Sequence, residues 1–130
     1  MEMEIVRRKR HTAGQYMCHE KPLIKLELNR GQVVVFQKSM ELMGFKHNEA
    51  VMFGFNKKEK RGFLFKEDPQ PDSYYLRNSS RGYSRFTSKD LMLYMVDVFD
   101  IPAEAKVVYF EIEKQPTEKG AFIFRLTDEI

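Results

Sequence analysis

Apolar and polar residues alternate along several short stretches of this chain, and each stretch predicts a β-strand with one buried face. In residues 23–28, isoleucine and leucine occupy every second position and alternate with Lys25 and Glu27. The same period of two, or a short β-branched or aromatic run, recurs later in the chain. The further strands predicted in this way are 33–35, 51–55, 63–65, 74–76, 108–112 and 122–126.

Two segments have the spacing of amphipathic helices. In residues 37–43, Met40 and Met43 are three positions apart, and Gly44 follows where a left-handed helix cap is expected. The second helix is predicted at 88–99. Its apolar positions are Leu91, Tyr94, Met95 and Val98.

Turn and capping residues separate these elements. Thr87 and Asp90 have the spacing of a capping box, with a hydroxyl at the cap and a carboxylate three residues later. Asn48 tolerates a positive φ in the polar turn after the first helix. Residues 77–82, RNSSRG, are predicted to form a turn or loop, and the two prolines within 67–73 mark a junction.

The pattern of strand, helix, turn and strand occurs twice, in residues 31–55 and again in 84–112. The repeat distance is roughly 50 residues, the scale at which internal duplications are sought. Because one such unit cannot bury both faces of its sheet, we expect the two copies to interleave. The sequence therefore predicts a β-rich α+β fold made of two β-α-β-β repeats, about 22–68 and 74–130, in one domain behind a flexible basic segment at 1–21.

The first repeat resembles the AbrB type of swapped-hairpin domain. In that family a Leu-Gly-Ile-Lys-x-Gly-Asp turn follows a short helix, and MGFKHNE at 43–49 occupies the same place with the same length. SRFT at 84–87 repeats the Arg-hydrophobic-Thr start, so the whole chain is similar to the MraZ-type regulators, which hold two such units. Phe36 and Ser88 replace the usual proline, Gln32 replaces an arginine, and the Asp-x-x-x-Arg signature of MraZ is absent.

This resemblance covers about two thirds of the chain. It implies a DNA-binding, transcription-regulatory protein in which interleaved sheets form a homodimer. The departures from the family pattern affect operator recognition more than the fold.

A second resemblance points to single-stranded nucleic acid. Residues 51–98 can also be divided into four strands followed by a helix, which is similar to the positive-cofactor type of single-strand binder. Basic and aromatic residues on a curved sheet bind the strand in that family. The corresponding residues are Lys57, Lys60, Tyr74, Tyr75, Arg77, Arg81, Tyr83 and Arg85.

Composition and charge permit nucleic-acid binding without requiring it. The 130 residues are 42% hydrophobic and carry a formal net charge of +3, with 19 carboxylates in the balance. Cys18 is the single cysteine, so no intrachain disulfide forms and a cytoplasmic location is expected. The first residues lack the apolar run of a secretory signal, and no stretch is long and apolar enough for a membrane span, so no membrane partner is expected.

The sequence offers little for catalysis. Phosphate-binding loops, dinucleotide fingerprints and nucleophile elbows are absent. Cys18, His19 and Glu20 are adjacent, whereas metal ligands are normally spaced along the chain. We therefore predict a protein without enzymatic activity, metal or cofactor.

Clustered cations are the strongest functional signal. Arginines recur every fourth residue around the 77–82 loop, and small residues there permit close approach to a phosphate backbone. A second cluster lies in the charged hairpin loop at 56–61, and a third forms a basic arm near the start of the chain. The predicted nucleic-acid-binding residues are Arg77, Arg81 and Arg85, then Lys57, Lys58, Lys60 and Arg61, then Arg7, Arg8, Lys9 and Arg10.

A protein-interaction or structural module is the alternative to a nucleic-acid-binding protein. Hairpin loops are often charged for solubility alone, and a basic arm also suits an acidic protein partner. Salt separates the two hypotheses, because phosphate binding weakens steeply with ionic strength through counterion release.

Overall fold

The computed structural model describes residues 21–78 and 83–127 of the chain. The predicted flexible segment at 1–21 therefore lies outside the described residues, apart from Lys21. The first repeat contains β1 (Leu23–Glu27), β2 (Gln32–Val35), α2 (Gln37–Met43), β3 (Ala50–Asn56) and β4 (Arg61–Lys66). The second contains β5 (Tyr74–Tyr75), β6 (Arg77–Asn78), β7 (Ser84–Thr87), α3 (Lys89–Phe99), β8 (Val107–Ile112) and β9 (Phe122–Thr127).

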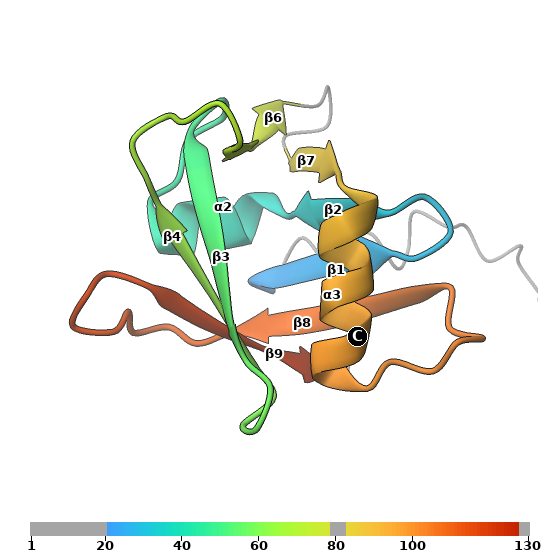
Figure 1. Cartoon of the computed structure of the whole chain (residues 1–130). Helices are drawn as coiled ribbons and strands as arrows, with labels where there is room; N and C mark the ends of the chain where they lie inside the picture. Colours follow the sequence, from blue (N-terminus) through green and yellow to red (C-terminus); the bar gives the residue numbers. More distant parts are fainter. Residues whose placement is uncertain (1–20, 79–82, 128–130) are drawn as a thin grey trace, which may run out of the picture.

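All strands belong to one antiparallel sheet in the order β5-β3-β4-β9-β8-β1-β2-β7-β6. Its two ends, β5 and β6, are neighbours in the chain and are separated by Leu76 alone, so the sheet curls into a nearly closed barrel (Figure 1). α3 stands against one side of this barrel, beside the long β3–β4 hairpin, and α2 lies across its back.

The two repeats interleave around an approximate twofold axis. β2 pairs with its counterpart β7, and β4 pairs with its counterpart β9. β1 lies between β2 and β8, and the corresponding segment of the second repeat, β5 with β6, lies between β7 and β3. The predicted fold class, β-rich α+β with two helices, is confirmed, and in each half extra strand segments precede the predicted β-α-β-β unit.

The core fills the barrel with aromatic and aliphatic side chains. Phe110 and Phe124 are fully buried, and their ring centroids are 5.5 Å apart in an edge-to-face contact. Phe99 of α3 packs on both rings, at 4.8 and 6.0 Å, and this contact anchors the helix to the sheet. A second, smaller cluster on the outer face joins Leu23, Val34 and Phe36.

Local predictions around the first helix are confirmed. Met40 and Met43 are buried against the core. Gly44 caps the helix with φ 69°, and its N–H donates to carbonyls of the last turn. Asn48 has φ 68°, the left-handed conformation predicted for this turn.

Two local predictions are wrong. Arg77 and Asn78 form strand β6 rather than part of a loop, because they pair with β7. The cap of α3 is Ser88 rather than Thr87: the Ser88 hydroxyl accepts from the Leu91 N–H at 3.2 Å. Thr87 is instead the last residue of β7, where it pairs with Gln32.

Candidate functional site

Arg77 and Arg85 come together on the barrel surface. They are directly opposite each other in the β6–β7 pair, and both are exposed. Opposite residues in antiparallel strands have Cα atoms about 4.5–5.5 Å apart and share a face of the sheet. The structure thus places two of the three predicted loop arginines side by side, while Arg81 lies outside the described residues.

The arginine pair carries uncompensated charge. Within residues 21–78 and 83–127, neither Arg77 nor Arg85 has a carboxylate within ion-pair distance. Like charges directly opposite on a sheet destabilise the pair. The nearest lysine in the same cross-strand row, Lys25, is half-buried and forms an ion pair with Glu27 at 3.0 Å.

The hairpin-loop cations have a different environment. Lys57 pairs with Asp97 at 3.0 Å and Lys60 with Asp100 at 2.8 Å, so both lysines bridge the loop to α3. Arg61 pairs with Glu59 at 3.2 Å. In the described part of the chain Lys58 is the one member of this cluster without an ion pair. The cluster therefore joins the hairpin to the helix, and most of its charge is locally balanced.

The Lys60–Asp100 pair gives a pH-dependent prediction. The hydrogen bond from Lys60, then its charge, holds the pKa of Asp100 below its ordinary value of 3.8. A depressed folded-state pKa stabilises the protein above the unfolded-state pKa, and this contribution is lost as the pH falls through the folded-state pKa. Lys60→Gln should raise the pKa of Asp100 toward 3.8, measured by NMR titration of its carboxyl.

The matched control for this titration is Lys38→Gln, which breaks an exposed ion pair with Glu41 elsewhere. It should leave the Asp100 titration unchanged. An Asp100 pKa that does not respond to Lys60→Gln would show that the pair does not persist in solution.

The tyrosines predicted to stack on unpaired bases are engaged within the protein. Tyr74 packs against Phe53 and Phe86, with centroid distances of 5.6 and 5.2 Å. Tyr83 packs edge-on against Phe36 at 6.3 Å. The Tyr75 hydroxyl donates to the Gln70 carbonyl at 3.3 Å. Each of these tyrosines thus has a contact within the protein that stacking on an unpaired base would have to accommodate.

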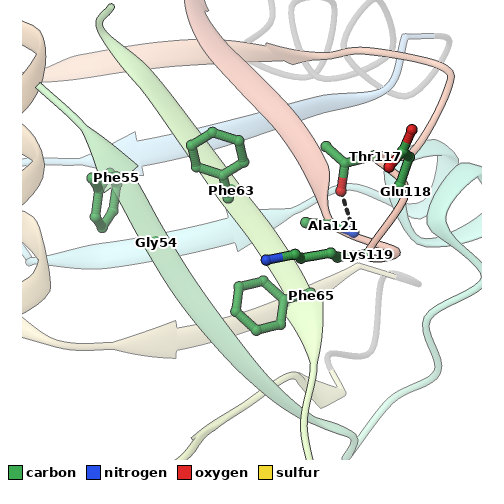
Figure 2. A pocket seen from close by; sticks show the side chains of 8 residues that line it. All are labelled: Gly54, Phe55, Phe63, Phe65, Thr117, Glu118, Lys119 and Ala121. Atoms are coloured by element: carbon green, nitrogen blue, oxygen red, sulfur yellow. Dashed lines mark hydrogen bonds between the residues drawn. The ribbon is translucent and has the colours of Figure 1, made fainter. Parts of the chain in front are cut away.

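A pocket of about 700 Å³ opens on the outer face of the β3–β4 hairpin. Gly54 forms its floor, and the Phe63 and Phe65 rings and the Lys119 side chain line it (Figure 2). The loop between β8 and β9 forms the far wall, where Thr117 Oγ1 accepts from the Ala121 N–H at 3.1 Å. The floor is apolar, and the β8–β9 loop contributes one carboxylate, Glu118, and one cation, Lys119, to the lining.

A second hollow lies between β3 and α3. It measures about 430 Å³ and is lined by Phe53, Phe55, Tyr74, Leu91, Tyr94 and Asp90. Ring contacts from Phe55 to Tyr94, at 5.2 Å, and to Phe99, at 6.2 Å, close the end nearest the hairpin tip. We call this hollow the β3–α3 groove.

Neither hollow was predicted from the sequence, although the chain carries a local signal for the pocket on the β3–β4 hairpin. The β4 segment Phe63-Leu64-Phe65 is apolar at every position, so a strand with Leu64 buried must present both phenylalanines outward. Two adjacent aromatic side chains on the outer face of a strand are therefore visible in the sequence itself. The groove has no such local signal, because its walls come from segments about 40 residues apart.

The described residues contain no group of three His, Cys, Asp or Glu side chains arranged to hold a metal ion. Cys18, His19 and Glu20, like the basic arm Arg7–Arg10, lie outside the described residues. No helix in 21–78 or 83–127 is long and apolar enough to cross a membrane.

Comparisons with models of known protein families, with curated protein sequences and with solved structures found no match. The resemblances to AbrB-type domains and to single-strand binders therefore stay predictions.

Proposed function

We propose that this chain is a small non-catalytic protein that binds DNA, in a regulatory role, through the Arg77–Arg85 pair. The observation that supports this proposal is the placement of two exposed arginines opposite each other with no carboxylate beside them in the described residues. Guanidinium groups bind phosphate oxygens in a bidentate geometry. A bound phosphate would offset the repulsion between the two guanidinium groups, which is uncompensated in the free protein.

The other predicted cations have supporting roles in this proposal. Lys58 lies at the β3–β4 tip, at the opposite end of β3 from β5 and β6, and would contact a different phosphate from the arginine pair (Figure 1). Lys57, Lys60 and Arg61 must first leave their carboxylate partners to reach a phosphate. Arg81 and the arm Arg7–Arg10 would add electrostatic attraction. Cytoplasmic action agrees with a nucleic-acid target and with a single cysteine.

Removal of both arginines tests the proposal. Arg77→Ala with Arg85→Ala should weaken binding to a mixed-sequence duplex and lower the slope of log affinity against log salt by about 2, since each phosphate contact contributes about 0.9. The measurement is fluorescence anisotropy across a salt series. Far-UV circular dichroism should show an unchanged fold, because the substitutions remove a repulsion and no buried side chain.

The control removes the same number of charges elsewhere. Lys106→Ala with Lys114→Ala changes two exposed lysines that have no ion pair in the described part of the chain. The slope of log affinity against log salt for this lysine variant should stay close to that of the unmodified protein. Equal affinities and slopes for the arginine variant and the unmodified protein would refute the proposal, and a preference for single strands would favour the alternative of a single-strand binder.

A further inference from the structure

Most of one side of β3 is an open sheet edge in the described part of the chain. β3 pairs with β4 along its whole length, but its other side pairs with β5 only at Ala50 and Val51. Among the described residues, the rest of that side, Met52–Asn56, has no partner strand. An open edge presents backbone donors and acceptors that normally find a partner.

The direction of these backbone groups follows from two hydrogen bonds. The Ala50 carbonyl accepts from the Glu67 N–H and so points toward β4, while the Glu49 carbonyl accepts from the Leu76 N–H on the opposite side. Backbone groups alternate in direction along an antiparallel strand. The N–H and C=O groups of Phe53 and Phe55 therefore point away from β4, along the β3–α3 groove.

The edge is open because the preceding chain turns away from it. Continued pairing of β5 along β3 would bring Ser73 opposite Met52 and Pro71 opposite Gly54. Instead, Ser73 N–H donates to the Gln70 carbonyl at 3.1 Å, and the Ser73 hydroxyl accepts from Gln70 N–H. The turn that these two hydrogen bonds close over residues 70–73 takes the chain that precedes β5 away from β3.

The approximate twofold axis shows what fills the corresponding edge in the other half of the barrel. β8 is the counterpart of β3, and its free side is fully paired with β1, from Leu23 opposite Glu111 to Glu27 opposite Val107. Within β1, Ile24 and Leu26 are fully buried, while Lys25 and Glu27 lie on the outer face. An antiparallel strand with alternating apolar residues thus covers the free side of β8, whereas beside β3 the described residues place only the two-residue β5, opposite Ala50 and Val51.

The walls of the groove define the chemistry of an occupant. Side chains opposite Phe53 and Phe55 would share their face and meet those rings, with Leu91 and Tyr94 on the helix side. Asp90 lies at the Tyr74 end of the groove and has no ion pair in the described residues. Because an antiparallel occupant runs opposite to β3, its C-terminal end reaches Asp90.

We propose that the β3–α3 groove binds an extended segment of another protein by strand addition to β3. The segment pairs antiparallel with Phe53 and Phe55 through up to four backbone hydrogen bonds. It places apolar side chains at two alternate positions and a lysine or arginine near its C-terminal end. Only an extended polypeptide offers donors and acceptors at this spacing, and the Asp90 carboxylate disfavours a phosphate backbone. This binding site is separate from the Arg77–Arg85 surface and does not depend on the proposed DNA binding.

Amide exchange in the free protein is the first test. NMR hydrogen exchange on the full chain should find Met52 and Gly54 amides protected by β4, and Phe53 and Phe55 amides exchanging faster by roughly tenfold or more. Protection of Phe53 and Phe55 in the free monomer would mean that the chain fills its own edge. Protection that appears only in a dimer would assign the edge to a second copy. Either result overturns the proposal.

Peptide selection is the second test. A phage-displayed library of random peptides of about 12 residues is selected on the full chain. The enriched peptides should alternate apolar and polar residues and carry a C-terminal cation, and the best of them should slow exchange at Phe53 and Phe55 but not change Met52 or Gly54. N-methylation of the two peptide residues that face Phe53 and Phe55 should abolish this protection. Absence of enrichment, or protection that survives methylation, overturns the proposal.

Adjacent residues of α3 provide a matched pair of variants. Tyr94 and Leu93 are 57% and 59% exposed, but only Tyr94 lines the groove. Tyr94→Ala should weaken peptide binding by about tenfold, the loss typical of one apolar contact, whereas Leu93→Ala should leave it unchanged. Asp90→Asn should weaken peptides with the C-terminal cation and spare those without it. If the peptide bound the Tyr94→Ala and Leu93→Ala variants with equal affinity, the groove would not be its binding site.

Discussion

Gly62→Ala is expected to destabilise the protein by about 1–3 kcal/mol, the usual cost of overpacking a core. Gly62 is buried on β4, directly opposite Phe124 on β9. A Cβ at this position would overlap the Cζ and Cε2 atoms of the Phe124 ring, so the ring must move. Phe124 is fully buried and touches the rings of Phe55, Phe99 and Phe110, so it has little room to do so.

Gly54→Ala is the matched control in the same hairpin. A Cβ there would lie 3.7 Å from Phe63 Cβ, an ordinary van der Waals distance. Its free energy of unfolding in urea should stay within about 0.5 kcal/mol of the unmodified protein. Phe124→Leu in the Gly62→Ala background should recover part of the loss, because the smaller side chain leaves space for the new methyl group. Equal stability of the two alanine variants would contradict the packing described at Phe124.

Leu76→Ala is expected to cost about 2–5 kcal/mol, the range for truncation of a buried leucine, out of a total of about 5–15 kcal/mol for a domain. Leu76 is fully buried and lies at the break between β5 and β6. Its N–H donates to the Glu49 carbonyl at 3.1 Å, and its carbonyl accepts from the Asn48 N–H at 2.6 Å. These backbone bonds hold the segment that joins the two ends of the sheet, and the buried side chain anchors the same segment in the core.

Thermal and urea unfolding measure this loss. Leu76→Met, which nearly conserves volume, should cost less than about 1.5 kcal/mol. Leu93→Ala, a truncation of a leucine that is 59% exposed on α3, should change stability by less than about 0.5 kcal/mol. A Leu76→Ala variant as stable as Leu93→Ala would mean that the barrel closes without this side chain.

Several features of the fold could be predicted because their signals are local. Alternation placed strands β1, β3, β8 and β9 within a residue or two of their observed bounds. Gly44 and Asn48 adopt the left-handed conformation that turn chemistry predicted. The duplication was visible because both copies repeat the same order of periodic segments.

The errors and omissions concern partners distant in sequence. Arg77 and Asn78 carry no periodic signal of their own and become a strand only because β7 lies alongside them. Lys57 and Asp97 are 40 residues apart, so the charge balance of the hairpin loop was invisible in the sequence. Part of the arginine cluster could be predicted from the sequence. Arg77 and Arg85 are eight residues apart, a spacing at which two residues of a hairpin can lie opposite each other.

The sequence by itself determined both helices, the turn after the first helix and most of the strands, with β6 as an exception, because each depends on side-chain periodicity or on backbone preferences within a few residues. Only the tertiary structure decided how the two copies pair, which cations are neutralised and which edge of β3 stays open. Those features depend on the register between distant strands, and that register is set when the whole core packs together. The two candidate surfaces, the Arg77–Arg85 pair and the β3–α3 groove, both arise from that packing.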